Sequence, residues 1–213
     1  PTPEPTPEPP RLEPEPPLEN PPLYDAPLLG APTGTPEQAA RWLYALAGRT
    51  YDDAGIVTIV NAYVAHGDAV GLDWFLALAQ NFHETDHLRS WWAQRPRRNP
   101  AGIGVTGATS IVQPSYGAWV WKEETQLWHE GVSFERWEPD AVKAHLGRLL
   151  AYALAEPQTA AQREMIDYAL AFRSLSRHRG AAQTITGLNG KWAVPGSTYG
   201  QRIIMLRDQM RQM

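Results

Sequence analysis

The side chains best suited to chemistry lie between residues 77 and 92, in the segment ALAQNFHETDHLRSWW. If this segment is helical, Gln80, Glu84 and His87 share one side at positions i, i+4 and i+7, so Glu84 can face a cleft. A separate apolar stripe at helical spacing would face the core and consists of Phe75, Leu78, Ala79 and Phe82. Burial raises the pKa of a carboxyl group, which can then act as a general acid near neutral pH. A surface glutamate paired with Arg89 or His87 is the alternative.

The same segment also matches a metal-binding pattern. His83-Glu84-Thr85-Asp86-His87 fits H-E-x-x-H, which on a helix places two imidazoles on one face beside a glutamate base. A zinc peptidase needs a third ligand, and no His, Asp or Glu occurs from Leu88 to Lys122. A zinc metallopeptidase is therefore kept as an alternative function, whereas the preferred function needs no metal and no cofactor.

A glycine-rich turn follows this segment. Its residues Asn99, Gly102 and Ile103 come after Glu84-Thr85 and Ser90 in the chain. This order resembles the catalytic region of glucosaminidase-type peptidoglycan hydrolases, the mannosyl-glycoprotein endo-β-N-acetylglucosaminidase-like family. That family shows a helix ending in Glu-Ser/Thr-Gly, then a serine, then an Asn-x-x-Gly-Ile turn. One departure is Asp86, which stands where the family usually has glycine.

Two later segments extend the resemblance. The sequence KWAVPGSTYGQRI resembles the family's aromatic-Ala-x-x-Pro-x-Tyr segment, and it supplies Trp192 and Tyr199. Phe134-x-x-Trp137, followed by a helix over 141–154, resembles the family's strand that runs into a helix. The resemblance covers about 71–213 and implies a lysozyme-like fold, in which a helical domain carries a small β-lobe.

The resemblance also implies roles for individual residues. Glu84 would be the general acid for the β-1,4 bond between N-acetylglucosamine and N-acetylmuramic acid, or for a related chitobiose-type link, and Tyr199 joins it in the predicted catalytic set. The β-lobe would supply the second carboxylate, for which we favour Glu124 over Glu123, Glu130 and Glu135. If no second acid is close, the N-acetyl group of the substrate could assist. The predicted substrate-binding residues are Ser90, Trp91, Trp92, Asn99, Gly102, Ile103, Trp119, Trp121 and Trp192.

Tryptophans are frequent, with nine in 213 residues. Indole rings stack on the apolar faces of sugars, so a groove lined by them suits a glycan. About half of the tryptophans near the predicted cleft are expected to fill the core instead, and Trp42 and Trp74 are assigned to the core. One local basic cluster, Arg95, Arg97 and Arg98, could meet muramyl lactate or peptide carboxylates, or be a solvated loop.

The elements that must position these residues are mainly helical. Thr35-Pro36 predicts a helix start, and Gly48 predicts its end. Further helices are expected over an apolar stretch at 55–65, from Asp73 to about Leu88, and over 139–155, 160–175 and 197–212, the last with Ser197 as its N-cap. Glycines and alternating aromatic residues between 102 and 134 predict one hairpin that turns near 124–126. The fold class is therefore mainly α (α+β), with a small β excursion after the third helix.

Composition sets the limits of the domain and of its partners. Residues 1–32 read as an extended Pro/Glu-rich linker, and 33–213 as one domain. Residues 1–22 carry five acids and one base, so the remaining 18 acids and 18 bases leave the body formally neutral, which argues against nucleic-acid binding. No apolar run is long enough to span a membrane, so no membrane insertion is expected. We expect a secreted or virion-associated module of a longer bacterial or phage chain that acts on peptidoglycan strands, or a non-catalytic wall-binding module.

Overall fold

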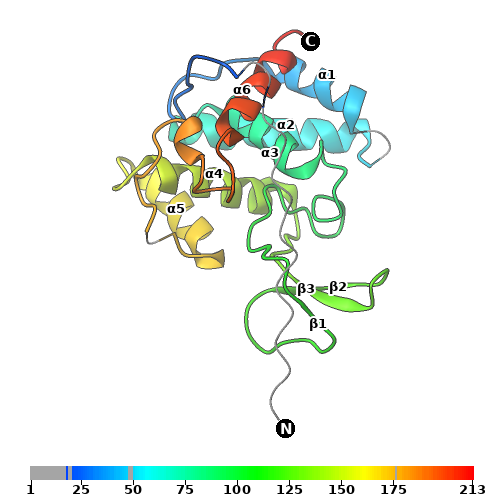
Figure 1. The fold of residues 1–213 in the computed structure, drawn as a ribbon. Coiled ribbons are helices and arrows are strands. Elements are labelled where there is room, and N and C mark those ends of the chain that lie inside the picture. Colours follow the sequence, from blue (N-terminus) through cyan, green and yellow to red (C-terminus); the bar gives the residue numbers. More distant parts are fainter. Residues whose placement is uncertain (1–17, 19–20, 48–49, 176) are drawn as a thin grey trace.

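The computed structural model of the protein describes Leu18 and residues 21–47, 50–175 and 177–213. These residues form a mainly helical body with a small sheet at one end (Figure 1), which confirms the mainly α (α+β) part of the predicted fold class. The α-helices are α1 (Pro36–Leu46), α2 (Asp53–Val70), α3 (Trp74–Thr85), α4 (Val142–Ala153), α5 (Ala160–Phe172) and α6 (Tyr199–Met210). A π-helical turn (Trp137–Ala141) precedes α4, and a 3-10 turn (Thr186–Leu188) precedes α6.

Helix starts follow the expected capping chemistry in part. Thr35 and Gln38 form a capping box at the start of α1. Gly48, the expected end of that helix, lies outside the described residues. Asp73 caps α3 by accepting hydrogen bonds from the backbone N–H groups of Phe75 and Leu76. The last helix begins at Tyr199 with Thr198 as its N-cap, so the prediction of Ser197 as the cap is wrong.

Helix α3 ends earlier than predicted. It stops at Thr85 because Asp86, His87 and Leu88 all have positive φ, at 50°, 56° and 65°. Residues in this left-handed region cannot continue a right-handed helix. Asp86 is the left-handed C-cap, a position at which glycine is favoured and Asp is tolerated. That explains how Asp86 can replace the glycine of the family that the segment resembles.

The sheet contains the predicted hairpin and one additional strand. Strands β2 (Trp119–Lys122) and β3 (Leu127–Glu130) pair antiparallel around a turn at 123–126, as expected. Strand β1 (Thr109–Ser110) pairs with the other side of β3, which gives the order β1-β3-β2. A two-residue strand is too short to show a period in the sequence, so it escaped prediction. Figure 1 shows the sheet standing apart from the helices.

Helix α3 runs through the core. Every residue from Trp74 to Phe82 is buried, including the polar Gln80 and Asn81. A helix that is buried on all sides needs partners for its polar side chains, since an unpaired buried polar group is costly. These two residues are therefore the places where the core must supply specific hydrogen bonds.

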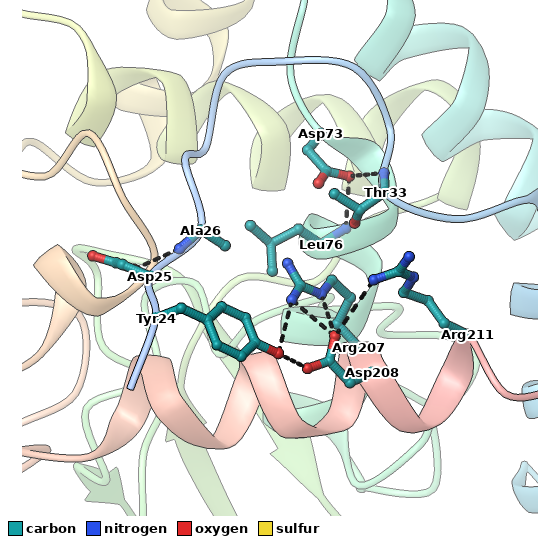
Figure 2. Close-up of polar contacts among 9 residues, drawn as sticks. All are labelled: Tyr24, Asp25, Ala26, Thr33, Asp73, Leu76, Arg207, Asp208 and Arg211. Atoms are coloured by element: carbon teal, nitrogen blue, oxygen red, sulfur yellow. Dashed lines mark hydrogen bonds and ion pairs between the residues drawn. The ribbon is translucent and has the colours of Figure 1, made fainter. Parts of the chain in front are cut away.

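The N-terminal side of the domain includes a strap at 24–33 that was assigned to the linker. Leu28 is only 1% exposed, its N–H donates to the carbonyl of Gln183, and its carbonyl accepts from the N–H of Asp73. Figure 2 shows the strap crossing α6 and α3: the Tyr24 hydroxyl donates to Asp208, and the Thr33 N–H donates to Asp73 Oδ1 at 3.1 Å. The folded unit therefore includes residues before the boundary predicted at 33. In the described part of the chain, no helix has the length and apolarity required to cross a membrane.

Candidate active site

Glu84 and Tyr199, two residues predicted to act together, meet between α3 and α6. Glu84 lies on the last turn of α3, and Tyr199 is the first residue of α6. The Tyr199 hydroxyl donates to Glu84 Oε1 at 2.5 Å. Tyr199 is 3% exposed, whereas Glu84 is partly exposed. The carboxyl group is thus bound from the protein side while its residue keeps partial access to solvent.

Behind this pair, a row of hydrogen bonds runs into the core. The Gln80 side-chain amide donates to the Tyr199 hydroxyl at 2.7 Å, and its carbonyl oxygen contacts His145 Nε2 at 2.9 Å. The other ring nitrogen of His145, Nδ1, contacts the Tyr63 hydroxyl at 2.7 Å. We call Tyr63, His145, Gln80 and Tyr199 the buried network; all four side chains are 0–3% exposed.

The donors in the buried network all point the same way. Because Gln80 presents a carbonyl oxygen to His145, the Nε2 atom must carry the proton and donate. Burial lowers the pKa of His145 to about 3, so the ring is neutral and its Nδ1 accepts from Tyr63. Burial and the Glu84 carboxyl group raise the pKa of Tyr199, which therefore keeps its proton. Each member thus donates toward Glu84, and the last donor is the Tyr199 hydroxyl.

The glycine-rich turn closes over the other oxygen of Glu84. A β-carbon built on Gly102, which has φ of 61°, would lie 3.9 Å from Glu84 Oε2. Asn99 shapes this turn, because its side chain bonds the backbone of Ala101, Ile103 and Val132. Asn99 is 0% exposed, so it supports the turn and does not face solvent. Ile103 is also buried, which leaves Gly102 as the part of the turn that neighbours the carboxyl group.

The end of α3 argues against the zinc alternative. Because the helix ends at Thr85, His83 and His87 are not on one helical face. His87 is packed between the rings of Trp42 and Phe82, and its desolvation lowers its pKa. Within the described residues, no group of three or more His, Asp or Glu side chains is placed to hold a metal ion.

Ser90 and Asp86 occupy the loop that follows α3. The Ser90 Oγ accepts from the N–H of Ala93 at 3.2 Å, so it caps the following turn. Asp86 pairs with Arg89 at 2.6 Å near the surface, and this pairing lowers the pKa of Asp86. Its charge is therefore bound by a neighbour on the loop.

The predicted tryptophans divide into groups. Trp91 packs edge-on against Trp92, with the Arg97 guanidinium 3.8 Å from its ring centre. Trp92 in turn covers Gly131, where a β-carbon would lie 2.4 Å from the indole. These two side chains join the α3 loop to the sheet. Trp137 is a core residue at 5% exposure.

Other tryptophans are more accessible. Trp121 is 36% exposed on β2, and its indole donates to Glu123. Trp119 is partly exposed and donates to the backbone carbonyl of Tyr116. Trp192 lies elsewhere, partly buried, with its ring centre 5.9 Å from that of His145.

The acidic residues of the hairpin differ in their surroundings. Glu124 is exposed on the β2–β3 turn, while Glu123 binds Trp121 and Gln126 beside it. Glu130, at the end of β3, accepts a hydrogen bond from Thr106. Glu130 also lines a cavity of about 280 Å³, together with Gly104, Thr106, Gly117, Ala118, Val132, Phe172 and Arg173. Gly104 comes two residues after Gly102, so one turn links the surroundings of Glu84 to this cavity.

Comparison of the chain with protein-family models, with curated proteins and with solved structures finds no significant match. The chemistry of the site is therefore inferred from its own geometry. A partly exposed carboxyl group with one oxygen bound by tyrosine and the other beside a glycine turn is suited to giving a proton to a ligand. Of the residues around it, His145 and Tyr63 were missed, since nothing in their sequence neighbourhood distinguishes them from ordinary buried residues.

Proposed function

We propose that the protein is a glycoside hydrolase of the endo-β-N-acetylglucosaminidase type, with a lysozyme-like fold, that cleaves the β-1,4 bond of N-acetylglucosamine in peptidoglycan. The observation that carries the proposal is the position of Glu84 between the Tyr199 hydroxyl and the Gly102 turn. The resemblance of these same residues to the glucosaminidase-type hydrolases supports the choice of reaction. The Pro/Glu-rich N-terminal segment is proposed to tether this domain within a longer secreted or virion-associated chain.

In the proposed reaction, Glu84 protonates the glycosidic oxygen from Oε2, the oxygen beside the Gly102 turn, while Tyr199 binds Oε1. The bond from the sugar C1 to that oxygen then breaks, and its electron pair goes to the leaving sugar. The hydroxyl of Tyr199 stabilises the carboxylate that proton transfer creates. Water adds to C1, and the proton that it releases restores the Glu84 carboxyl group, which completes hydrolysis.

Positive charge that develops at C1 needs a second group. We propose Glu130 for this role in place of Glu124. Glu130 lines the cavity that Gly104 also lines, two residues after Gly102, whereas Glu124 is exposed on the hairpin turn. If the N-acetyl group of the substrate assists instead, Glu130 would orient it.

The test is mass spectrometry of fragments released from purified sacculi. Wild type is expected to create new reducing ends at N-acetylglucosamine. Glu84→Gln, which keeps the shape and the hydrogen-bond acceptor, is expected to lower the rate by about 10²- to 10⁴-fold. Glu156→Gln, a change of an exposed carboxyl group in the loop between α4 and α5, is the matched control and should cleave like wild type.

Three results would reject the proposal. Reducing ends at muramic acid would identify a muramidase. Sacculi that are bound but never cleaved, with Glu84→Gln identical to wild type, would identify a wall-binding module. Activity that is lost on chelation and restored by zinc would return the metallopeptidase alternative.

A further inference from the structure

Helix α4 carries an arginine, Arg148, close to His145 of the buried network. Arg148 follows His145 by three residues, so both lie on one face of the helix. The Arg148 guanidinium lies 5.7 Å from the ring centre of Trp192 and 5.9 Å from that of Tyr152. One of its nitrogens donates to the backbone carbonyl of Arg173 at 3.1 Å. The guanidinium is therefore held between two aromatic rings and a carbonyl.

The charge of Arg148 is poorly compensated. Burial lowers the pKa of Arg148, the Tyr152 hydroxyl partly offsets this, and the nearby positive charge of Arg173 lowers the pKa further. Across residues 21–47, 50–175 and 177–213, no carboxylate forms an ion pair with either guanidinium. By contrast, Arg207, which is also withdrawn from solvent, is bound by Asp208 at 2.8 Å. A partly buried, unpaired charge beside a like charge is costly unless an anion joins it.

The two arginines lie beside the proposed active site. Arg173 lines the cavity of about 280 Å³ that also contains Glu130. On the other side of Arg148, Trp192 is in contact distance of His145, which belongs to the buried network behind Glu84. The arginine pair thus connects the cavity wall with the aromatic ring of Trp192.

We propose that Arg148 and Arg173 form a binding site for a carboxylate of the substrate, with Trp192 supporting the sugar ring that carries it. This inference rests on the proposed function and specifies its substrate class: a glycan with a carboxylate substituent, in place of a neutral chitin-type glycan. The carboxylate comes either from the lactyl ether of muramic acid or from the stem peptide attached to it. Two guanidinium groups match a carboxylate in geometry and charge.

The basic cluster suggested by sequence is less suited to this role. Arg97 covers Trp91 and donates to its carbonyl, and Arg95 lies over Tyr51 near Asp52. Arg98 donates to the carbonyl of Pro96 at 2.9 Å. These side chains are engaged in holding the loop after α3, whereas no carboxylate of the described residues forms an ion pair with Arg148 or Arg173.

Direct binding of small probes tests the site. The signal of the Trp192 indole N–H in a ¹H–¹⁵N spectrum would be followed during titration with N-acetylmuramic acid or N-acetylglucosamine. In wild type, N-acetylmuramic acid is expected to bind about tenfold more tightly than N-acetylglucosamine, because a charge-assisted hydrogen bond contributes roughly that factor or more. Arg148→Gln and Arg173→Gln should each remove this preference without weakening N-acetylglucosamine. Arg163→Gln, an exposed position on α5, should keep it.

This readout needs no turnover, so it remains valid even if hydrolysis is never observed. Equal binding of both sugars by wild type, with no preference for a stem-peptide fragment either, would overturn the inference. So would a preference that survives both arginine substitutions. If Arg148→Gln does not fold, the binding preference of Arg173→Gln decides the test. The Arg173 side chain is exposed, so its substitution should leave the fold intact. A stem-peptide fragment that shifts the Trp192 signal while N-acetylmuramic acid does not would support the carboxylate site and assign its source to the peptide.

Discussion

The buried network behind Glu84 and the β2–β3 hairpin hold their polar side chains in opposite ways. In the network, each hydrogen bond joins distant parts of the chain, such as Tyr199 to Gln80 or His145 to Tyr63. In the hairpin, polar contacts are local: Trp121 donates to Glu123, and Gln126 donates to Glu123. We expect the network to control proton affinity at the site and the hairpin to contribute binding surface.

The difference has a physical cause. Residues of the network are withdrawn from water, where an unpaired donor or acceptor is costly, so each group must have one defined partner. Residues on the hairpin turn are exposed and can exchange a protein partner for water at little cost. Substitution in the network should therefore alter rate and pH dependence, and substitution of the exposed residues of the hairpin should at most alter affinity.

The largest expected effect concerns the two candidate second carboxylates, of which Glu130 lines the cavity and Glu124 is exposed on the hairpin turn. Glu130→Gln is expected to lower the rate on sacculi by about 10- to 100-fold, because the cavity loses its carboxylate. Glu124→Gln, at the exposed turn, should change the rate by less than about threefold. The measurement is the initial rate of release of reducing ends, with melting temperatures to verify folding. The reverse order of effects would return the role to Glu124.

Removal of the last donor in the network comes next in size. Tyr199→Phe deletes the hydroxyl that binds Glu84 Oε1, and the rate should fall by about tenfold since a charged acceptor loses one hydrogen bond. The donated bond favours the ionised form of Glu84, so its loss should move the alkaline limb of the pH–rate profile to higher pH. Tyr199 also contacts the Gln80 amide and the His83 ring. A lower rate with an unmoved profile would show that Tyr199 only fills space.

The sequence predicts the helices well where the signals are local. The helix starts predicted at Thr35-Pro36 and near Asp73 depend on neighbouring residues, and both are present in the structure. The predicted end of α3 at about Leu88 was wrong. The left-handed conformation of His87 and Leu88 is imposed by their surroundings, and their residue types do not indicate it.

The same distinction applies to the candidate site. Glu84, Gly102 and Tyr199 were found from a motif order, and the structure brings them together. His145 and Arg148 could not be found in this way, because their roles arise from contacts between α4 and residues far along the chain. Long-range contacts between buried polar groups are set by tertiary packing and leave no periodic pattern.

The pH dependence of stability separates the network from the surface. His145 has a pKa of about 3 in the folded protein, against about 6.5 when unfolded. The unfolded chain therefore binds a proton first as the pH falls below 6.5, and stability should fall by up to roughly 1.4 kcal/mol per pH unit until about pH 3. His145→Gln lacks this group. Its free energy of unfolding, measured by urea denaturation at several pH values between 7 and 4, should therefore fall less steeply with decreasing pH than that of the wild type. Equal slopes in both proteins would mean that His145 is not held neutral.

The smallest expected effect concerns the exposed indole of the hairpin. Trp121 is 36% exposed and packs against Trp128 at 5.7 Å, so its removal leaves the helical core unchanged. Trp121→Ala should raise KM for sacculi about threefold while kcat and the pH profile stay as in wild type, because stacking on a sugar acts equally in the ground state and the transition state. A change in kcat or in the alkaline limb would contradict the division, since it would couple the hairpin to the proton held by Glu84. An unchanged KM would place the sugar along Trp192 and the cavity beside Glu130, away from the outer face of β2.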